Sequence, residues 1–210
     1  MAKHQSISMS VIRRLPRYYR FLFDLMQNGV TRISSRDLAT RMGLTASQIR
    51  QDLNCFGGFG QQGYGYMVEQ LYSEIGHILG VDRPADTILI GAGNLGCAIA
   101  NHINFDIRGI HLAGIFDDSP SIIGTRIQER DVLPTDQLED FCREHQPVIA
   151  ILCIPKEAAA AMVKRLTTLG IHSFWNFSHY DIAFDYPEAN VENVHLGDSL
   201  LTLAYQAKTE

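Results

Sequence analysis

The chain has 210 residues, of which 46% are apolar and 20% are charged, so its length allows one large domain or two small ones. It has no run of about 18 uncharged apolar residues and no N-terminal apolar core of signal-peptide length. We therefore expect neither a membrane span nor secretion. The four cysteines lie far apart without a C-x-x-C motif, which favours reduced thiols in the cytoplasm and predicts no metal site.

The net charge of −5 is unevenly distributed along the chain. Residues 1–83 contain ten Lys and Arg against six Asp and Glu, whereas residues 84–210 contain eight against seventeen. The first third could therefore approach nucleic acid although the whole chain is acidic. A Gly, a Pro and three charges interrupt the pattern within Gly80–Asp86, and we place a domain boundary between residues 82 and 83.

Two helices are predicted at the start of the first region. The first begins at Pro16, which suits a first helical turn, and its apolar stripe ends near Gly29. The second helix has the sequence SRDLATRM. Ser34 or Ser35 can cap its N-terminus, and Gly43 terminates it.

A third helix follows after a short turn. Thr45 and Gln48 form a capping box at its start, in which each side chain can bond to the other residue's backbone N–H, and the helix runs through Leu53. This spacing is typical of a helix-turn-helix, whose second helix can enter a major groove. The glycine-rich segment Phe56–Tyr66 predicts a β-hairpin wing, and Met67–Leu79 predicts a fourth helix.

Strands and helices alternate in the second region. The predicted strands are TILIGA, HLAGIFD, VIAILCI and HSFWNF, and the predicted helices are residues 94–104, one capped by Thr135 and one opened by Pro155. This alternation favours a parallel sheet with helices on both faces. The fold class is therefore α/β, with an N-terminal winged helix-turn-helix and a Rossmann-type doubly wound parallel-sheet domain.

A G-x-G-x-x-G motif lies between the first of these strands and its helix. Gly91 would permit a tight turn, Gly93 would let a pyrophosphate approach the backbone, and Gly96 would allow close helix–strand packing. Asp117 ends the second strand, where it can bind the adenosine ribose hydroxyls and would repel the 2′-phosphate of NADP. We predict an NAD(H) site, with a tight turn that binds no ligand as the alternative. The motif comprises Gly91, Ala92, Gly93, Asn94, Leu95 and Gly96.

Catalytic machinery is harder to find. A hydride-transfer enzyme needs a proton donor and a substrate-orienting group near the nicotinamide. The histidines have no recognisable Asp or Arg partner in the sequence, and little chain remains after the sheet for a substrate domain. We expect a non-enzymatic regulator that senses the nucleotide, and a small NAD-dependent oxidoreductase is the alternative.

The basic residues of the first region predict contacts with DNA. Arg50 and Gln51 lie on the third helix with Ser47 one turn earlier, where Arg can bind guanine and Gln can pair with adenine. Arginines crowd the first helix, where we expect phosphate contacts, and a solvated helix face is the alternative. The predicted contacts are Arg13, Arg14, Arg17, Ser47, Gln48, Arg50, Gln51, Gln61, Gln62 and Gly63.

In this order, the motifs resemble the Rex family of bacterial redox-sensing transcriptional repressors from about Ile12 to Tyr205. The most specific stretch is Ser34–Tyr66, SSRDLATRMGLTASQIRQDLNCFGGFGQQGYGY. The segments GAGNLG, IFDDSPSIIG, IPKEAA, NF and VENV follow in the family's order. The resemblance implies a homodimer that binds a palindromic operator through its winged helices, reads the NADH/NAD⁺ ratio through its Rossmann domains, and releases DNA when NADH binds.

The resemblance also implies a wider nucleotide site and a third chain segment. Residues 83–193 would form the Rossmann domain, and a C-terminal helix within residues 194–210 would swap onto the partner subunit. The apolar stripe of that helix independently lacks an obvious partner in its own chain, with packing on its own Rossmann domain as the alternative. Further nucleotide contacts would be Cys153, Ile154, Pro155, Asn176 and Phe177.

The sequence departs from the family pattern at the residues that transmit the nucleotide's state. Arg20 is kept, but His102 stands where the family carries Tyr, and His195 stands where it carries Asp. In the family, the Asp of one subunit pairs with the Arg or the Tyr depending on the bound nucleotide. The two replacements leave open whether the NADH response is kept, weakened or made pH-dependent. A divergent paralogue that binds DNA with an altered nucleotide response is a further alternative.

Overall fold

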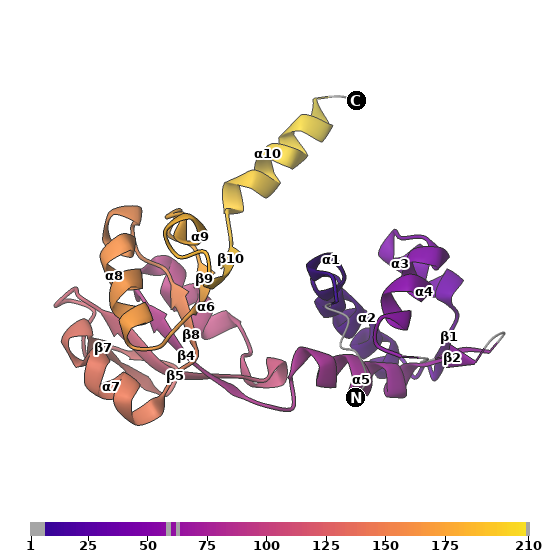
Figure 1. Cartoon of the computed structure of the whole chain (residues 1–210), viewed down its shortest axis with the longest axis horizontal. Coiled ribbons are helices and arrows are strands. Elements are labelled where there is room, and N and C mark those ends of the chain that lie inside the picture. The colour runs from indigo at the N-terminus through magenta and orange to yellow at the C-terminus, as the bar shows by residue number, and fades with distance from the viewer. Residues whose placement is uncertain (1–6, 58–59, 62–63, 209–210) are drawn as a thin grey trace. The chain divides into compact units, whose positions relative to one another are not determined.

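The computed structural model describes residues 7–57, 60–61 and 64–208. The chain divides into two compact units, Met1–Asp82 and Arg83–Glu210, which are joined where helix α5 (Val68–Leu79) leads into strand β4 (Ala85–Ile90) (Figure 1). Each unit has its own hydrophobic core, one in the first and one on each face of the sheet in the second.

The first unit combines short helices with a small antiparallel sheet of order β1-β3-β2. Its core contains Leu22 from α2, Leu38 from α3, Ile49 from α4 and Leu71 from α5, all nearly fully buried. This arrangement confirms the expected winged helix-turn-helix. Its elements are α1 (Met9–Ile12), α2 (Leu15–Gln27), β1 (Arg32–Ile33), α3 (Ser35–Met42), α4 (Ala46–Asn54), β2 (Gly60–Gln61), β3 (Gly65–Met67) and α5 (Val68–Leu79).

The two helices of the helix-turn-helix have side-chain caps. The Ser34 hydroxyl accepts a hydrogen bond from the Asp37 N–H at 3.0 Å, and α3 ends at Gly43, which has a left-handed φ of 62°. The Thr45 hydroxyl accepts from the Gln48 N–H at 3.1 Å. The capping box also predicted a bond between the Gln48 side chain and the Thr45 N–H. That prediction is wrong, because the Gln48 side chain is directed to Asp52, to which its amide nitrogen donates.

Two short elements of this unit were missed by the sequence analysis. Helix α1 precedes α2, which begins at Leu15 with Pro16 in its first turn. Strand β1 has only two residues, and it forms because Ile33 pairs with Tyr66 of β3. An element of this length has no periodicity that could reveal it.

The second unit is built on a seven-stranded sheet of order β10-β9-β8-β4-β5-β7-β6. All neighbours pair in parallel except β6 and β7. Numbered along the chain without the antiparallel β6, this is the doubly wound Rossmann order, with its switch point between β4 and β8. The strands are β4 (Ala85–Ile90), β5 (Ile110–Asp117), β6 (Arg126–Ile127), β7 (Arg130–Pro134), β8 (Ile149–Leu152), β9 (Ser173–Asn176) and β10 (Asn190–Asn193).

Alternate residues of the central strand pack on opposite faces of the sheet. Ile88 and Ile90 face α7 and α8, whereas Leu89 faces α6. Thr135 does not cap α7, because its hydroxyl donates to Asp118. The helices are α6 (Asn94–His102), η1 (Asp106–Arg108), η2 (Thr135–Gln137), α7 (Leu138–His145), α8 (Lys156–Thr168), α9 (Ile182–Asp185) and α10 (Leu196–Ala207).

Candidate functional site

The glycine turn lies at the carboxyl end of β4, beside the switch point of the sheet. Gly91 has φ +95°, and a Cβ atom there would lie 2.6 Å from the Cys153 carbonyl oxygen. A Cβ atom at Gly96 would lie 1.9 Å from the Gly91 carbonyl oxygen. Both positions therefore require glycine, because the backbone after β8 and the start of α6 approach the turn closely.

Gly93 differs from the other two glycines of the motif. A Cβ atom at this position would meet no atom within 4 Å. Gly93 is also the N-cap of α6, whose first turn has no side-chain capping bond. Backbone N–H groups at such a helix end attract anions, so the space above Gly93 suits a pyrophosphate.

Asp117 ends β5 next to this turn. Its carboxylate accepts hydrogen bonds from the Ala92 N–H and the Ser119 N–H, each at 2.7 Å. These bonds fix the half-buried carboxylate at the edge of the crevice. A carboxylate has further acceptor positions, which remain for ribose hydroxyl groups.

The segment after β8 forms the opposite side of the crevice. Cys153 and Ile154 are half-buried, and Pro155 is exposed. Burial raises the pKa of the Cys153 thiol to about 12, so this side chain is neutral at physiological pH. Phe177, after β9, packs edge-on against Trp175 with ring centroids 4.8 Å apart.

Asn176 does not fit the expected role of a nucleotide contact. Its side chain is fully buried. The amide nitrogen donates to the Tyr180 carbonyl and to Asn193, and the amide oxygen accepts from the Ser178 N–H and hydroxyl. The side chain thus joins β9 to β10 and the following loop, and we correct its assignment to a structural one.

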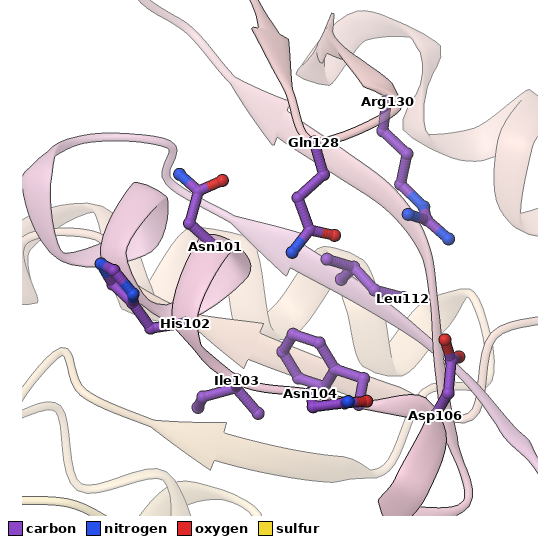
Figure 2. Close-up of a pocket in the computed structure, with 9 residues that line it drawn as sticks. Asn101, His102, Ile103, Asn104, Asp106, Leu112, Gln128 and Arg130 are labelled. Atoms are coloured by element: carbon purple, nitrogen blue, oxygen red, sulfur yellow. The ribbon is translucent and has the colours of Figure 1, made fainter.

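His102, one of the three expected switch residues, is exposed at the last position of α6. It lines a cavity of about 270 Å³ at the end of α6 remote from the glycine turn. Figure 2 shows Gln128 and Arg130 extending toward this cavity from the β6–β7 hairpin. The Gln128 side chain donates to the Ala100 carbonyl at 2.6 Å, which ties the hairpin to α6.

His195, the second switch residue, occupies the N-cap position of α10 without a side-chain capping bond, and it has a partner that the sequence did not suggest. Its Nδ1 atom lies 2.8 Å from Nδ1 of His179, and the two rings stack with centroids 4.8 Å apart. One imidazole must donate and the other accept in this contact. Arg20, the third switch residue, is exposed on α2 in the other unit.

The candidate nucleic-acid interface is the exposed face of α4. Ser47, Arg50 and Gln51 are exposed there, and an Arg50 guanidinium nitrogen donates to the Ser35 hydroxyl at 3.2 Å. Arg13 and Arg17 are exposed near the start of α2. Gln61 lies in β2, whereas Gln62 and Gly63 lie outside the described residues.

Two of the residues that were expected to contact DNA, Arg14 and Gln48, bind a buried carboxylate of their own unit instead. The Arg14 guanidinium forms a two-pronged ion pair with Asp52, and the Gln48 amide also donates to that carboxylate. We correct Arg14 to a structural residue, and the bond from Gln48 limits its reach toward DNA. Sequence reasoning missed Asp52, although its place between Ile49 and Leu53 on the apolar face of the helix was a signal.

Helix α10 carries a broad apolar face whose side chains are exposed in the part of the second unit that the structure describes. The side chains of Leu196, Leu200, Leu201, Leu203 and Tyr205 are 60–72% exposed. Apolar surface of this extent on one helix is typical of a protein–protein interface.

Among residues 7–57, 60–61 and 64–208, no helix has the length and apolarity needed to cross a membrane. Within the same described residues, no three His, Cys, Asp or Glu side chains are grouped as metal ligands.

Comparisons with known proteins cover both units. The family model "Putative DNA-binding protein N-terminus" matches residues 6–54, and the model "CoA binding domain" matches residues 82–180. The chain is 52% identical to the redox-sensing transcriptional repressor Rex of Thermoanaerobacter pseudethanolicus, over 100% of this chain and 93% of that protein. It is also 52% identical to the Rex repressor of Clostridioides difficile, over 99% of both chains.

Solved structures give the same likeness in three dimensions. A structure of RSP in complex with β-NAD⁺ and operator DNA matches with a TM-score of 0.89 and 52% identity, over 97% of this chain and 93% of that one. A structure of RSP with β-NADH matches with a TM-score of 0.89 and 48% identity, over 98% and 96% of the two chains.

Proposed function

Because the chain belongs to the Rex family of redox-sensing transcriptional repressors, we propose that it binds operator DNA and releases it when NADH binds. The likeness to RSP over 97–98% of the chain carries this proposal, because RSP was solved with β-NAD⁺ and operator DNA and with β-NADH. The relatives are named as repressors rather than enzymes, which disfavours the oxidoreductase alternative. We place the activity in the cytoplasm, in keeping with four free cysteines.

The nucleotide site would lie in the crevice beside β4 and β8. The pyrophosphate would bind over Gly93 at the N-terminus of α6, and Asp117 would bind the adenosine ribose. Cys153, Ile154, Pro155 and Phe177 would line the remaining walls. This placement is supported by the open space at Gly93 and by the fixed carboxylate of Asp117.

The DNA site and the dimer would use the other exposed features. Residues 1–82 would bind DNA, with α4 in the major groove, and residues 83–193 would bind the nucleotide. Within residues 194–210, α10 would pack on a second copy of the chain. The exposed apolar side chains of α10 support this homodimer, and a dimer matches the two-fold symmetry of a palindromic operator.

We expect the Gly93→Ala variant to fold normally and to bind NADH at least about tenfold more weakly, or by 1.4 kcal/mol. The added methyl group meets no protein atom within 4 Å but would occupy the space assigned to the pyrophosphate. Isothermal titration with NADH gives the dissociation constant, and thermal unfolding by circular dichroism controls for the fold. A variant that binds NADH as tightly as the unmodified chain would move the pyrophosphate elsewhere.

We expect Arg50→Ala to lose about 1–3 kcal/mol of operator affinity, because Arg50 is the exposed arginine on the outer face of α4. Fluorescence anisotropy with an operator duplex selected from a random library measures this loss. Arg41→Ala, which removes the same charge from α3, is the matched control and should weaken operator and scrambled DNA alike. Equal losses for the two variants would show that Arg50 does not read bases.

A further inference from the structure

A buried carboxylate lies at the junction of α2 and α4. The Asp52 side chain is fully buried and accepts four hydrogen bonds. The Arg14 Nε and Nη2 atoms donate at 2.7 Å each, the Tyr18 hydroxyl donates at 2.9 Å, and the Gln48 amide donates at 2.8 Å. A buried charge is tolerated only where partners of this kind replace water.

The carboxylate is ionised at neutral pH. Burial alone would raise the pKa of Asp52, but the hydrogen bonds from Arg14, Gln48 and Tyr18 together hold it below its ordinary value. Burial and the bond to Asp52 raise the pKa of Tyr18, so its hydroxyl stays a donor. Arg14 and Asp52 therefore form a charged pair with two parallel hydrogen bonds, a geometry that fixes direction as well as distance.

The packing around α4 gives this cluster a specific task. One side of α4 is held by apolar contacts of Ile49 and Leu53 with the core. The side that carries Gln48, Gln51 and Asp52 borders an open hollow of about 660 Å³ next to α1. On this side the hydrogen bonds from Arg14 and Tyr18 to Asp52 hold α4 against the start of α2.

We propose that Asp52 is the positioning residue of the recognition helix. Through Arg14 and Tyr18 it fixes α4 against α2, so that Ser47, Arg50 and Gln51 reach the base edges in register. Asp52 touches no DNA itself, and Arg14 serves this orientation rather than a phosphate contact. The inference rests on the proposed binding of operator DNA by α4.

Asp52→Asn separates positioning from electrostatics. Removing a negative charge near DNA would strengthen binding to every duplex if charge alone mattered. Loss of the orientation of α4 would instead weaken binding only to the operator duplex, whose bases α4 reads. We expect Asp52→Asn to lower the affinity for the selected operator at least about tenfold, the effect of one charged hydrogen bond, without lowering the affinity for a scrambled duplex.

Two arginine variants form the matched pair. Arg17→Met removes an exposed arginine of α2 at a proposed phosphate contact, so it should weaken binding to both duplexes and reduce the salt slope by about 1. Arg14→Met should reproduce Asp52→Asn, with operator binding weakened and the salt slope unchanged. The Arg14→Met/Asp52→Asn double variant should be no weaker than either single variant, since both remove one interaction.

The measurement is fluorescence anisotropy with both duplexes at several salt concentrations, with circular dichroism and NADH affinity as controls for the two units. Should Asp52→Asn fail to fold, Tyr18→Phe decides, because it removes one hydrogen bond without changing charge and should lower the operator-to-scrambled ratio about threefold. The proposal is wrong if the folded variants keep the ratio of the unmodified chain, or if Arg14→Met lowers the salt slope as Arg17→Met does. An unmodified chain without operator preference would instead contradict the proposed function.

Discussion

The Gly96→Ala variant is expected to lose about 3 kcal/mol from the free energy of unfolding of the second unit. The added Cβ atom would lie 1.9 Å from the Gly91 carbonyl oxygen and 3.2 Å from a methyl carbon of Leu89. Because the first of these is a backbone atom of the tight turn, α6 must move away from β4. Denaturant unfolding followed by the fluorescence of Trp175, the only tryptophan of the chain, measures the change.

Gly93→Ala is the matched control, because it adds the same methyl group three residues earlier into open space. Its unfolding midpoint should stay at that of the unmodified chain. The two variants together separate the packing role of one glycine from the ligand role of the other. A Gly96→Ala midpoint equal to that of Gly93→Ala would contradict the close approach of α6 to the glycine turn.

The Leu200→Glu/Leu203→Glu variant is expected to raise the dimer dissociation constant at least about 1,000-fold, because each of the two subunits loses two leucines and each buried leucine contributes about 1.5–3 kcal/mol. Both side chains are at least 60% exposed on α10 in the single chain. Sedimentation equilibrium measures the dissociation constant, and a monomer should also bind a palindromic operator more weakly.

The opposite face of α10 provides the control. Thr202 and Gln206 lie on its polar side, so Thr202→Glu/Gln206→Glu adds the same two charges without touching the apolar face. This control should remain dimeric. If the leucine variant stays dimeric as well, α10 does not form the subunit interface.

The sequence predicted the elements that local chemistry specifies. Ser34 and Thr45 cap their helices because hydroxyl groups satisfy N–H groups at helix ends, and Gly43 ends a helix because it adopts a left-handed φ. The glycine turn could also be predicted from the sequence, because Gly91 adopts a positive φ. Strand β1 could not, because two residues show no periodicity and only pairing with β3 defines them.

Long-range polar contacts account for the errors at the candidate sites. Arg14 was expected to contact phosphate because it stands in a basic run of the sequence. Its guanidinium instead donates to Asp52, which lies 38 residues away in the sequence. Asn176 was expected to contact the nucleotide, but its amide nitrogen donates to Asn193, which lies 17 residues away in the sequence. His195 pairs with His179, a partner that no motif in the sequence indicated. Such partners are set by the tertiary fold, which no local pattern encodes.

A titration of operator-bound protein with NADH and, separately, with NAD⁺ tests the proposed release of DNA most directly. Redox sensing requires that NADH favours a state with low affinity for DNA, so NADH should lower the anisotropy of the labelled operator at concentrations at which NAD⁺ does not. Equal effects of the two nucleotides, or none from either, would contradict redox sensing by this chain.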